Sequence, residues 1–180
     1  MVAIETRQLI VYFENHVIGN LQEYNNIWQF TYHESWLTIP IGFDISPHLS
    51  RQTEPYIDGA SERHVQWFFD NLLPEEDART LLARDAAVTK DDVFGLLEYY
   101  GAESAGALTL LPVGKINPVS TFDELSLKVL SERIKKLPKI SLNKSAKKRM
   151  SLAGAQHKLA VVFHQGQLYE PSGSAPSSHI

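Results

Sequence analysis

Three short apolar segments near the N-terminus, joined by two polar turns, constrain the fold of this 180-residue chain more than any other feature. Residues 9–13, 17–21 and 27–32 are rich in β-branched and aromatic side chains, and the third alternates apolar with polar residues for most of its length. Residues 14–16 and Asn25-Asn26 have the composition of tight turns. The pattern predicts an antiparallel β-meander.

The hydrophobic period changes to that of a helix after residues 40–59, a loop-like stretch rich in proline and glycine. Apolar residues recur at helical spacing from Val65 to Leu73, with Ser61 as a possible N-cap. Pro74 suits the first turn of a second helix, whose positive end the acidic run Glu75-Glu76-Asp77 would stabilise. We therefore expect two successive helices.

A third helix and a last strand complete the predicted N-terminal unit. The helix is expected over residues 91–100, with Thr89 as a candidate N-cap and Gly101 as its end. Residues 107–111 return to the composition of a strand. Residues 1–113 are therefore interpreted as one α+β domain, an antiparallel sheet with helices.

Residues 114–180 are predicted to form a linker and a helix, followed by a strand and a return strand. Residues 114–124 are expected to be a linker, and residues 126–137 have helical spacing. The second half of residues 150–163 is a strand candidate, and Gln165-Gly166 suits a hairpin turn into a return strand.

The net charge of −4 conceals a basic segment at residues 128–150. Nine Lys and Arg residues against one acid, Glu132, give this segment a charge of +8 and leave −12 for the other residues. The segment could attract phosphates or nucleic acid, or it could be a solvated loop and helix face. It has no aromatic residue, so a base-stacking platform is not indicated. The basic residues are Lys128, Arg133, Lys135, Lys136, Lys139, Lys144, Lys147, Lys148 and Arg149.

The composition argues against several classes of protein. Cysteines are absent, which excludes disulfides and Cys-based zinc sites. The seven histidines show neither HxH nor HExxH spacing, so no metal site is predicted. No apolar run approaches the ~18–20 residues that span a bilayer, and no secretory signal pattern is visible. We expect a cytoplasmic protein that does not contact the membrane.

The segment Ser151-Leu-Ala-Gly-Ala-Gln-His-Lys158 has the clearest chemical meaning. Small residues let backbone N–H groups approach phosphate oxygens, and a lysine at the end can place a positive charge near them. These properties are those of a phosphate-covering loop in a kinase-type fold. A tight hairpin would have a similar composition, because the segment matches neither GxGxxG nor GxxxxGKS/T.

Four segments, in order along the chain, resemble the HipA family of toxin kinases. Ser151–Lys158 resembles the family's S-x-A-G-x-Q-x-K loop, and Trp67–Glu75 resembles its F-F-x-N-L-L-P-E/D helix. Gly101–Pro112 is similar to its segment from helix end to strand. Pro176–Ile180 is similar to P-T/S-T/S-H-I, which precedes the family's nucleotide-binding lysine. The resemblance covers residues 67–180.

The resemblance implies an α+β fold in which an N-terminal subdomain is followed by part of a kinase-like small lobe. It implies a protein serine/threonine kinase that uses ATP and Mg²⁺, with an aminoacyl-tRNA synthetase as a possible protein substrate. The implied partner is a small helix-turn-helix antitoxin, similar to HipB, through which DNA would be contacted only indirectly.

Residue by residue, the resemblance assigns the ATP-phosphate loop to Ala153, Gly154, Ala155, Gln156, His157 and Lys158. Ser151 matches the serine that the family autophosphorylates as an off-switch. His157 is a departure, since many relatives have Glu or another polar residue there. The family's catalytic Asp and Mg²⁺ ligands follow the His-Ile at which this chain ends, so no catalytic residue is assigned and the chain alone is expected to be inactive. Asp70-Asn71 and Asp91-Asp92 are interpreted as structural.

Two other functions stay open. The chain could be a stand-alone, non-enzymatic module that pairs with a separate kinase lobe or an antitoxin. Alternatively, residues 128–150 could bind nucleic acid, which predicts a steep dependence of binding on salt concentration.

Overall fold

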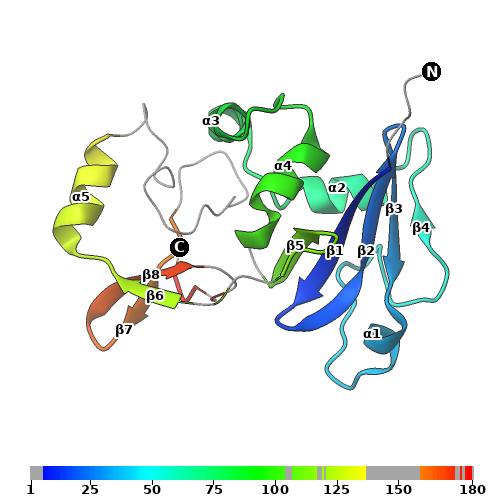
Figure 1. The fold of residues 1–180 in the computed structure, drawn as a ribbon, viewed down its shortest axis with the longest axis horizontal. Helices are drawn as coiled ribbons and strands as arrows, with labels where there is room; N and C mark the ends of the chain where they lie inside the picture. Colours follow the sequence, from blue (N-terminus) through cyan, green and yellow to red (C-terminus); the bar gives the residue numbers. More distant parts are fainter. Residues whose placement is uncertain are drawn as a thin grey trace.

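The computed structural model describes residues 6–103, 107–116, 119, 121–136, 159–172, 175 and 177–179, which form two antiparallel sheets with helices (Figure 1). The first sheet has the strand order β4-β3-β2-β1-β5, and the second has the order β6-β8-β7. The predicted α+β class, with an antiparallel sheet and helices, is thereby confirmed. The strands of the first sheet are β1 (Arg7–Phe13), β2 (His16–Tyr24), β3 (Ile27–Tyr32), β4 (Tyr56–Ile57) and β5 (Leu108–Pro112).

The predicted N-terminal meander is confirmed, and its second turn shows how the local sequence fixes it. β1 pairs with β2, and β2 pairs with β3, in antiparallel register. Asn25 and Asn26 have φ angles of 52° and 60°, the pair of left-handed conformations that a type I′ hairpin turn requires. Asparagine tolerates this conformation better than most residues. The turn therefore sets the register between β2 and β3, the two strands that it joins.

One face of the first sheet carries the apolar core. Figure 1 shows α2 (His64–Asp70), α3 (Glu76–Ala86) and α4 (Val93–Tyr100) on the same side of this sheet. The Trp28 ring packs on Phe94 with ring centroids 5.1 Å apart, and Phe30 packs on Phe69 at 5.7 Å. Each of these four side chains is at most 2% exposed. Because burial of one such side chain contributes about 1.5–3 kcal/mol, these contacts fix α2 and α4 to the sheet.

The start of α2 is stabilised by Asp58 and not by Ser61, so the predicted N-cap is wrong. The two carboxylate oxygens of Asp58 accept hydrogen bonds from the backbone N–H groups of Val65 (2.9 Å) and Gln66 (3.0 Å). Asp58 is 6% exposed. A single carboxylate thus satisfies two of the N–H groups that a helix start leaves unpaired, and its charge suits the positive end of the helix dipole.

The start of α4 is capped by Asp92, so the prediction of Thr89 is also wrong. The Asp92 carboxylate accepts from the Gly95 N–H at 3.0 Å and also pairs with the Arg7 guanidinium at 2.6 Å. Thr89 contributes its backbone carbonyl, which accepts from the Asp92 N–H. The predicted end at Gly101 is confirmed, and a short 3-10 helix, η1 (Gly101–Glu103), follows.

Three short elements were not expected from the sequence. α1 (Glu34–Thr38) follows β3, β4 lies inside the stretch expected to be a loop, and β6 (Thr121–Glu124) lies inside the expected linker. β4 pairs with β3, and β6 pairs with β8, a strand about fifty residues further along. These strands depend on distant partners, which local composition does not reveal.

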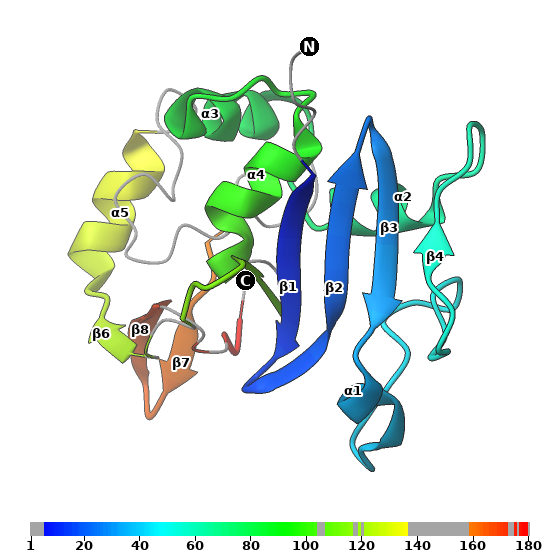
Figure 2. The same cartoon turned by 45° about the vertical axis from the view of Figure 1, so that its right-hand side comes forward.

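The second sheet lies beyond the β5 side of the first sheet, away from β4 (Figure 2). It consists of β6, β7 (Val162–His164) and β8 (Gln167–Ser172), with α5 (Leu127–Lys135) beside it. The predicted hairpin at Gln165-Gly166 is confirmed, with φ angles of 49° and 82°. In the part of the chain that the structure describes, no helix combines the length and the apolar character needed to cross a membrane.

Candidate functional site

The predicted phosphate loop, residues 153–158, and the predicted regulatory Ser151 lie outside the residues that the structure describes. Their roles therefore stay predictions. The structure does describe elements on both sides of the loop: α5 precedes it, and β7 and β8 follow it. It also describes residues 177–179, which belong to another segment singled out in the sequence.

Val161 is where two of the predicted segments meet. The Val161 N–H donates to the His179 carbonyl, and the His179 and Ser178 N–H groups donate to the Val161 carbonyl, all at 3.0 Å. The Phe163 N–H donates to Ser178 Oγ at 2.9 Å. The strand that follows the predicted phosphate loop therefore lies beside the segment that resembles the approach to a nucleotide-binding lysine.

A part-buried ion pair links α5 to β8. Arg133, in the last turn of α5, donates from Nη1 to Glu170 Oε1 and from Nη2 to Glu170 Oε2, the latter at 3.1 Å. The Arg133 and Glu170 side chains are 11% and 9% exposed. Such a two-point contact fixes the orientation of both groups as well as their distance. Sequence reasoning did not identify this pair, and the only signal for it is an acidic residue within a short strand.

The start of α5 is attached to the same strand. The Leu125 N–H donates to the Leu168 carbonyl at 2.8 Å, and Leu125 is 3% exposed. Ser126, the N-cap of α5, accepts from the Val129 N–H through its hydroxyl. β8 therefore holds the chain both before α5 and at its last turn.

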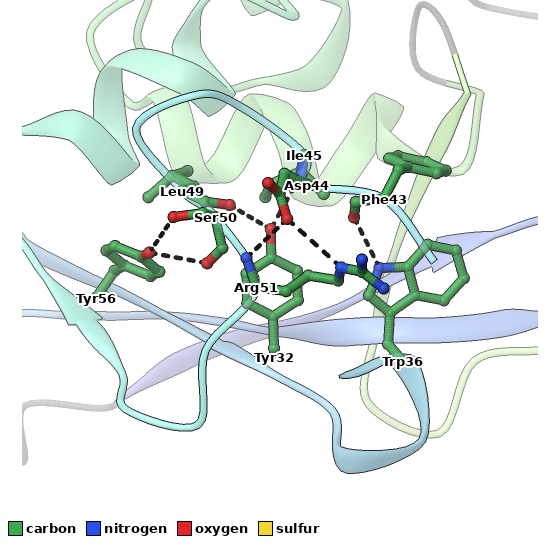
Figure 3. Close-up of polar contacts among 9 residues, drawn as sticks. All are labelled: Tyr32, Trp36, Phe43, Asp44, Ile45, Leu49, Ser50, Arg51 and Tyr56. Carbon is green, nitrogen blue, oxygen red and sulfur yellow. Dashed lines mark hydrogen bonds and ion pairs between the residues drawn. The ribbon is translucent and has the colours of Figure 1, made fainter. Parts of the chain in front are cut away.

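A second ordered polar region is the loop of residues 39–55 between α1 and β4 (Figure 3). The Tyr32 hydroxyl lies at its centre, where it accepts from the Ile45 N–H at 3.0 Å and donates to the Leu49 carbonyl. Burial raises the pKa of Tyr32 to about 12, so this hydroxyl is a neutral donor. Trp36 Nε1 donates to the Phe43 carbonyl at 3.1 Å.

The other polar groups of this loop also bind the loop itself. Asp44 Oδ1 accepts from the Arg51 N–H at 2.8 Å and pairs with Arg51 Nε at 3.4 Å. The Tyr56 hydroxyl donates to the Ser50 carbonyl at 2.8 Å (Figure 3). These groups therefore stabilise the loop conformation, and they do not form a nucleophile–base arrangement.

An acidic pocket of about 460 Å³ lies beside α3. It is lined by residues from both Asp pairs of the sequence, Asp70 and Asp91, together with Arg79 and Lys90. The Asp70 carboxylate forms an ion pair with Arg79. Among the described residues, no three His, Cys, Asp or Glu side chains are arranged to hold a metal ion.

Comparison with known proteins identifies the N-terminal part of the chain. Residues 9–111 match the model of the HipA N-terminal domain. The protein named "Putative kinase Y4mE" from Sinorhizobium fredii (strain NBRC 101917 / NGR234) is 30% identical over 185 residues, which cover 97% of this chain and 42% of that protein. The "Serine/threonine-protein kinase toxin HipA" of Shewanella oneidensis is 27% identical over 140 residues, which cover 77% of this chain and 31% of the relative.

A solved structure has the same fold. It is the complex of HipA and HipB of the Shewanella oneidensis MR-1 toxin–antitoxin system with operator DNA. The TM-score is 0.69 at 22% sequence identity, and the match covers 94% of this chain and 39% of that chain. This chain therefore spans about two fifths, or less, of the length of the proteins it matches.

Proposed function

The chain belongs to the HipA family, and from this premise we propose that it is the N-terminal region of a HipA-like serine/threonine protein kinase of a toxin–antitoxin system. The main support for the proposal is the 30% sequence identity, over 97% of the chain, to a relative whose name describes it as a putative kinase. That similarity continues past residues 9–111, which the family domain covers. It therefore includes the region of the predicted phosphate loop.

The proposed nucleotide site uses residues 153–158. Ala153, Gly154 and Ala155 are small enough for backbone N–H groups to approach phosphate oxygens, and Lys158 supplies a positive charge. Mg²⁺ bound with ATP neutralises charge that develops during phosphoryl transfer. Neither an HRD-like nor a DFG-like segment occurs in the sequence, so we assign the Mg²⁺ ligands and the catalytic Asp to a part of the kinase outside this chain.

Ser151 is the proposed off-switch. A phosphoserine adds about −1.5 to −2 charge units, which would lie next to the site for the ATP phosphates and repel them. Lys147, Lys148 and Arg149 are close enough in sequence to bind that phosphate instead. In the complete kinase, Ser151→Ala should prevent the loss of activity on incubation with ATP. A variant that still loses its activity would rule out this switch.

The proposed partner is a helix-turn-helix antitoxin similar to HipB. The solved neighbour, a complex of HipA, HipB and operator DNA, supports this choice and suggests that DNA is reached through the antitoxin. An aminoacyl-tRNA synthetase as the phosphorylated protein rests on the family resemblance alone.

ATP titration of this chain tests the proposed site. Without the rest of the kinase we expect weak binding, with a Kd on the order of 1 mM, which ligand-observed NMR can measure. Lys158→Ala should abolish this binding, while Lys136→Ala, which removes the same charge near the end of α5, should not. Equal binding by both variants would contradict the phosphate loop. Phosphate transfer to a generic substrate by this chain alone would contradict the placement of the catalytic groups elsewhere.

A second candidate function is a stand-alone, non-enzymatic module that pairs with a separate kinase lobe or with an antitoxin. The family model supports this second function, because its match covers residues 9–111 and does not include the predicted phosphate loop. Co-purification of the chain with a separately encoded kinase lobe would support this function.

A further inference from the structure

α5 exposes an apolar stripe of the kind that a helix usually turns toward a core. Leu127 and Ile134 lie seven positions apart on one side of the helix and are 73% and 52% exposed, and no residue of α5 is buried. The helix is nevertheless held in place, since Leu125 attaches its start to β8 and Arg133 attaches its last turn. Polar contacts therefore fix a helix whose apolar side stays open.

An exposed aromatic ring lies on the same side of the second sheet as α5. Arg133 contacts Glu170, so α5 lies over the face of β8 to which Glu170 points. Leu168 points to that face as well, because side chains two positions apart share one face of a strand. Leu168 pairs with Phe163 of β7, so the Phe163 ring is also on the α5 side, where it is 52% exposed.

The exposed apolar side chains of the described residues are concentrated in this part of the chain. Of the fourteen large apolar side chains that are exposed, seven lie within residues 113–134 and an eighth is Phe163, while the other six are spread over residues 24–99. Exposed apolar surface gathered in this way is typical of an interaction surface. The seven are Val113, Ile116, Val119, Phe122, Leu127, Val129 and Ile134.

The lengths of the related proteins indicate what covers this surface. The relative from Sinorhizobium fredii aligns with 97% of this chain but with only 42% of its own length, and the solved HipA chain aligns over 39% of its length. In both proteins, the region that matches α5 and β7 therefore belongs to a much longer polypeptide. The second sheet has three strands and, among its described residues, buries few large apolar side chains, so a further surface would stabilise it.

We propose that α5 and Phe163 form the docking surface for the part of the kinase that lies outside this chain and carries the catalytic groups. Leu127, Ile134 and Phe163 are the apolar centre of this docking surface. The inference rests on the proposed function and adds to it the surface through which the two parts of the kinase meet.

The charges beside the stripe define the chemistry of the surface that covers it. Lys128, Lys135 and Lys136 are exposed on and directly after α5, against a single exposed acid of the helix, Glu132. Like charges across an interface are costly, whereas opposite charges favour association. The covering surface should therefore have an apolar centre with acidic groups at its rim. A second copy of this chain would instead bring the same lysines together.

Hydroxyl-radical footprinting, read by mass spectrometry, measures the exposure of these side chains in this chain alone and in the complete kinase. We expect Leu127, Ile134 and Phe163 to oxidise roughly fivefold more slowly in the complete kinase, because the centre of an interface excludes water. Ile41 and Trp67, which are 53% and 49% exposed in the first domain, are the matched controls and should oxidise equally in both proteins. Equal oxidation of the three docking residues in both proteins would overturn the inference.

Leu127→Asp separates docking from the stability of this chain. Leu127 is already exposed here, so the variant should shift the melting temperature of the chain by less than about 2 °C. In the complete kinase the new charge would be buried without a partner, and the melting temperature should fall by about 5 °C or more. Ile41→Asp is the control and should have little effect in either protein. Equal shifts for Leu127→Asp in the two proteins would contradict the docking surface.

Other occupants of the surface would give different results. If this chain dimerised as its concentration rose, and Leu127→Asp abolished the dimer, the occupant would be a second copy and the inference would be wrong. Protection that appears only when the antitoxin is added would assign the surface to the antitoxin and would also overturn it. Protection of the three residues in a complete protein that neither binds ATP nor transfers phosphate would refute the proposed function and leave the docking surface in place.

Discussion

The two sheets of this protein are held together by different kinds of contact. The first sheet carries a contiguous core of aromatic and aliphatic side chains, among them Trp28, Phe30 and Phe69. Among the described residues, the second sheet is held by directed polar contacts, above all the part-buried pair of Arg133 and Glu170. Several large apolar side chains around it are more than half exposed: Phe122 (51%), Leu127 (73%), Ile134 (52%) and Phe163 (52%).

The difference shows which kind of change each region should tolerate. Apolar burial is not directional, so the first sheet should lose most when volume is removed from its core. Among its described residues, the second sheet buries few large apolar side chains, so its geometry should respond to changes in polar groups.

The largest effect is expected for Phe30→Ala. Phe30 is fully buried, so its truncation should lower the free energy of unfolding by about 3–5 kcal/mol, as measured by urea denaturation. The matched variant Phe163→Ala, in the second sheet, removes an aromatic ring that is 52% exposed and should change the free energy of unfolding by less than about 0.5 kcal/mol. Similar losses in the two variants would contradict the contrast between the sheets.

A smaller effect is expected for Asp58→Ala, which leaves two N–H groups at the start of α2 without their acceptor. The expected loss is about 1–3 kcal/mol in the free energy of unfolding. Ser61→Ala is the control, because Ser61 is the cap that the sequence suggested and the structure does not use; it should change stability by less than about 0.5 kcal/mol. The assignment of the cap to Asp58 would be wrong if Ser61→Ala were the more damaging change.

Tyr32→Phe should cost about 1–2 kcal/mol near neutral pH, because the loop between α1 and β4 loses both hydrogen bonds of the hydroxyl. The pKa of Tyr32 is about 12 in the folded protein, against about 10 for an unfolded tyrosine. The stability from this raised pKa is fully present below pH ~10 and is lost as the pH rises toward 12.

Melting temperatures measured between neutral and alkaline pH test this loss. The difference between the unchanged protein and Tyr32→Phe should shrink above pH ~10. Tyr24→Phe, at a position that is 50% exposed, is the control and should show no such change. A constant difference for Tyr32→Phe would contradict the buried, neutral hydroxyl.

The smallest effect is expected for Asp44→Asn. This change removes the charge pair with Arg51 but keeps an oxygen that can accept from the Arg51 N–H. The Arg51 and Asp44 side chains are 33% and 49% exposed, so the expected change is below about 1 kcal/mol and should diminish further at high salt. A loss as large as that of Asp58→Ala would mean that exposed ion pairs also stabilise the first region.

The sequence predicted what depends on neighbouring residues. The meander and the hairpin at Gln165-Gly166 follow from strand composition and from turn residues that accept positive φ angles. The end of α4 at Gly101 and the start of α5 at Ser126 are equally local.

What the sequence did not reveal depends on distant partners. Asp58 caps a helix from outside it, β6 forms only against β8, and Arg133 meets Glu170 across 37 positions. The positions singled out for nucleotide binding, residues 153–158, lie outside the described residues, so their role stays a prediction from the family resemblance.

The outer edges of the first sheet have a consequence for aggregation. At one edge β4 offers only the two residues Tyr56 and Ile57, and the Asp58 N–H that follows them is already bonded to the Trp28 carbonyl. At the other edge β5 ends in Pro112, which has no N–H to donate. Neither edge presents the long, regular row of free backbone groups that templates strand addition, so an isolated N-terminal domain should resist edge-to-edge polymerisation even at high concentration.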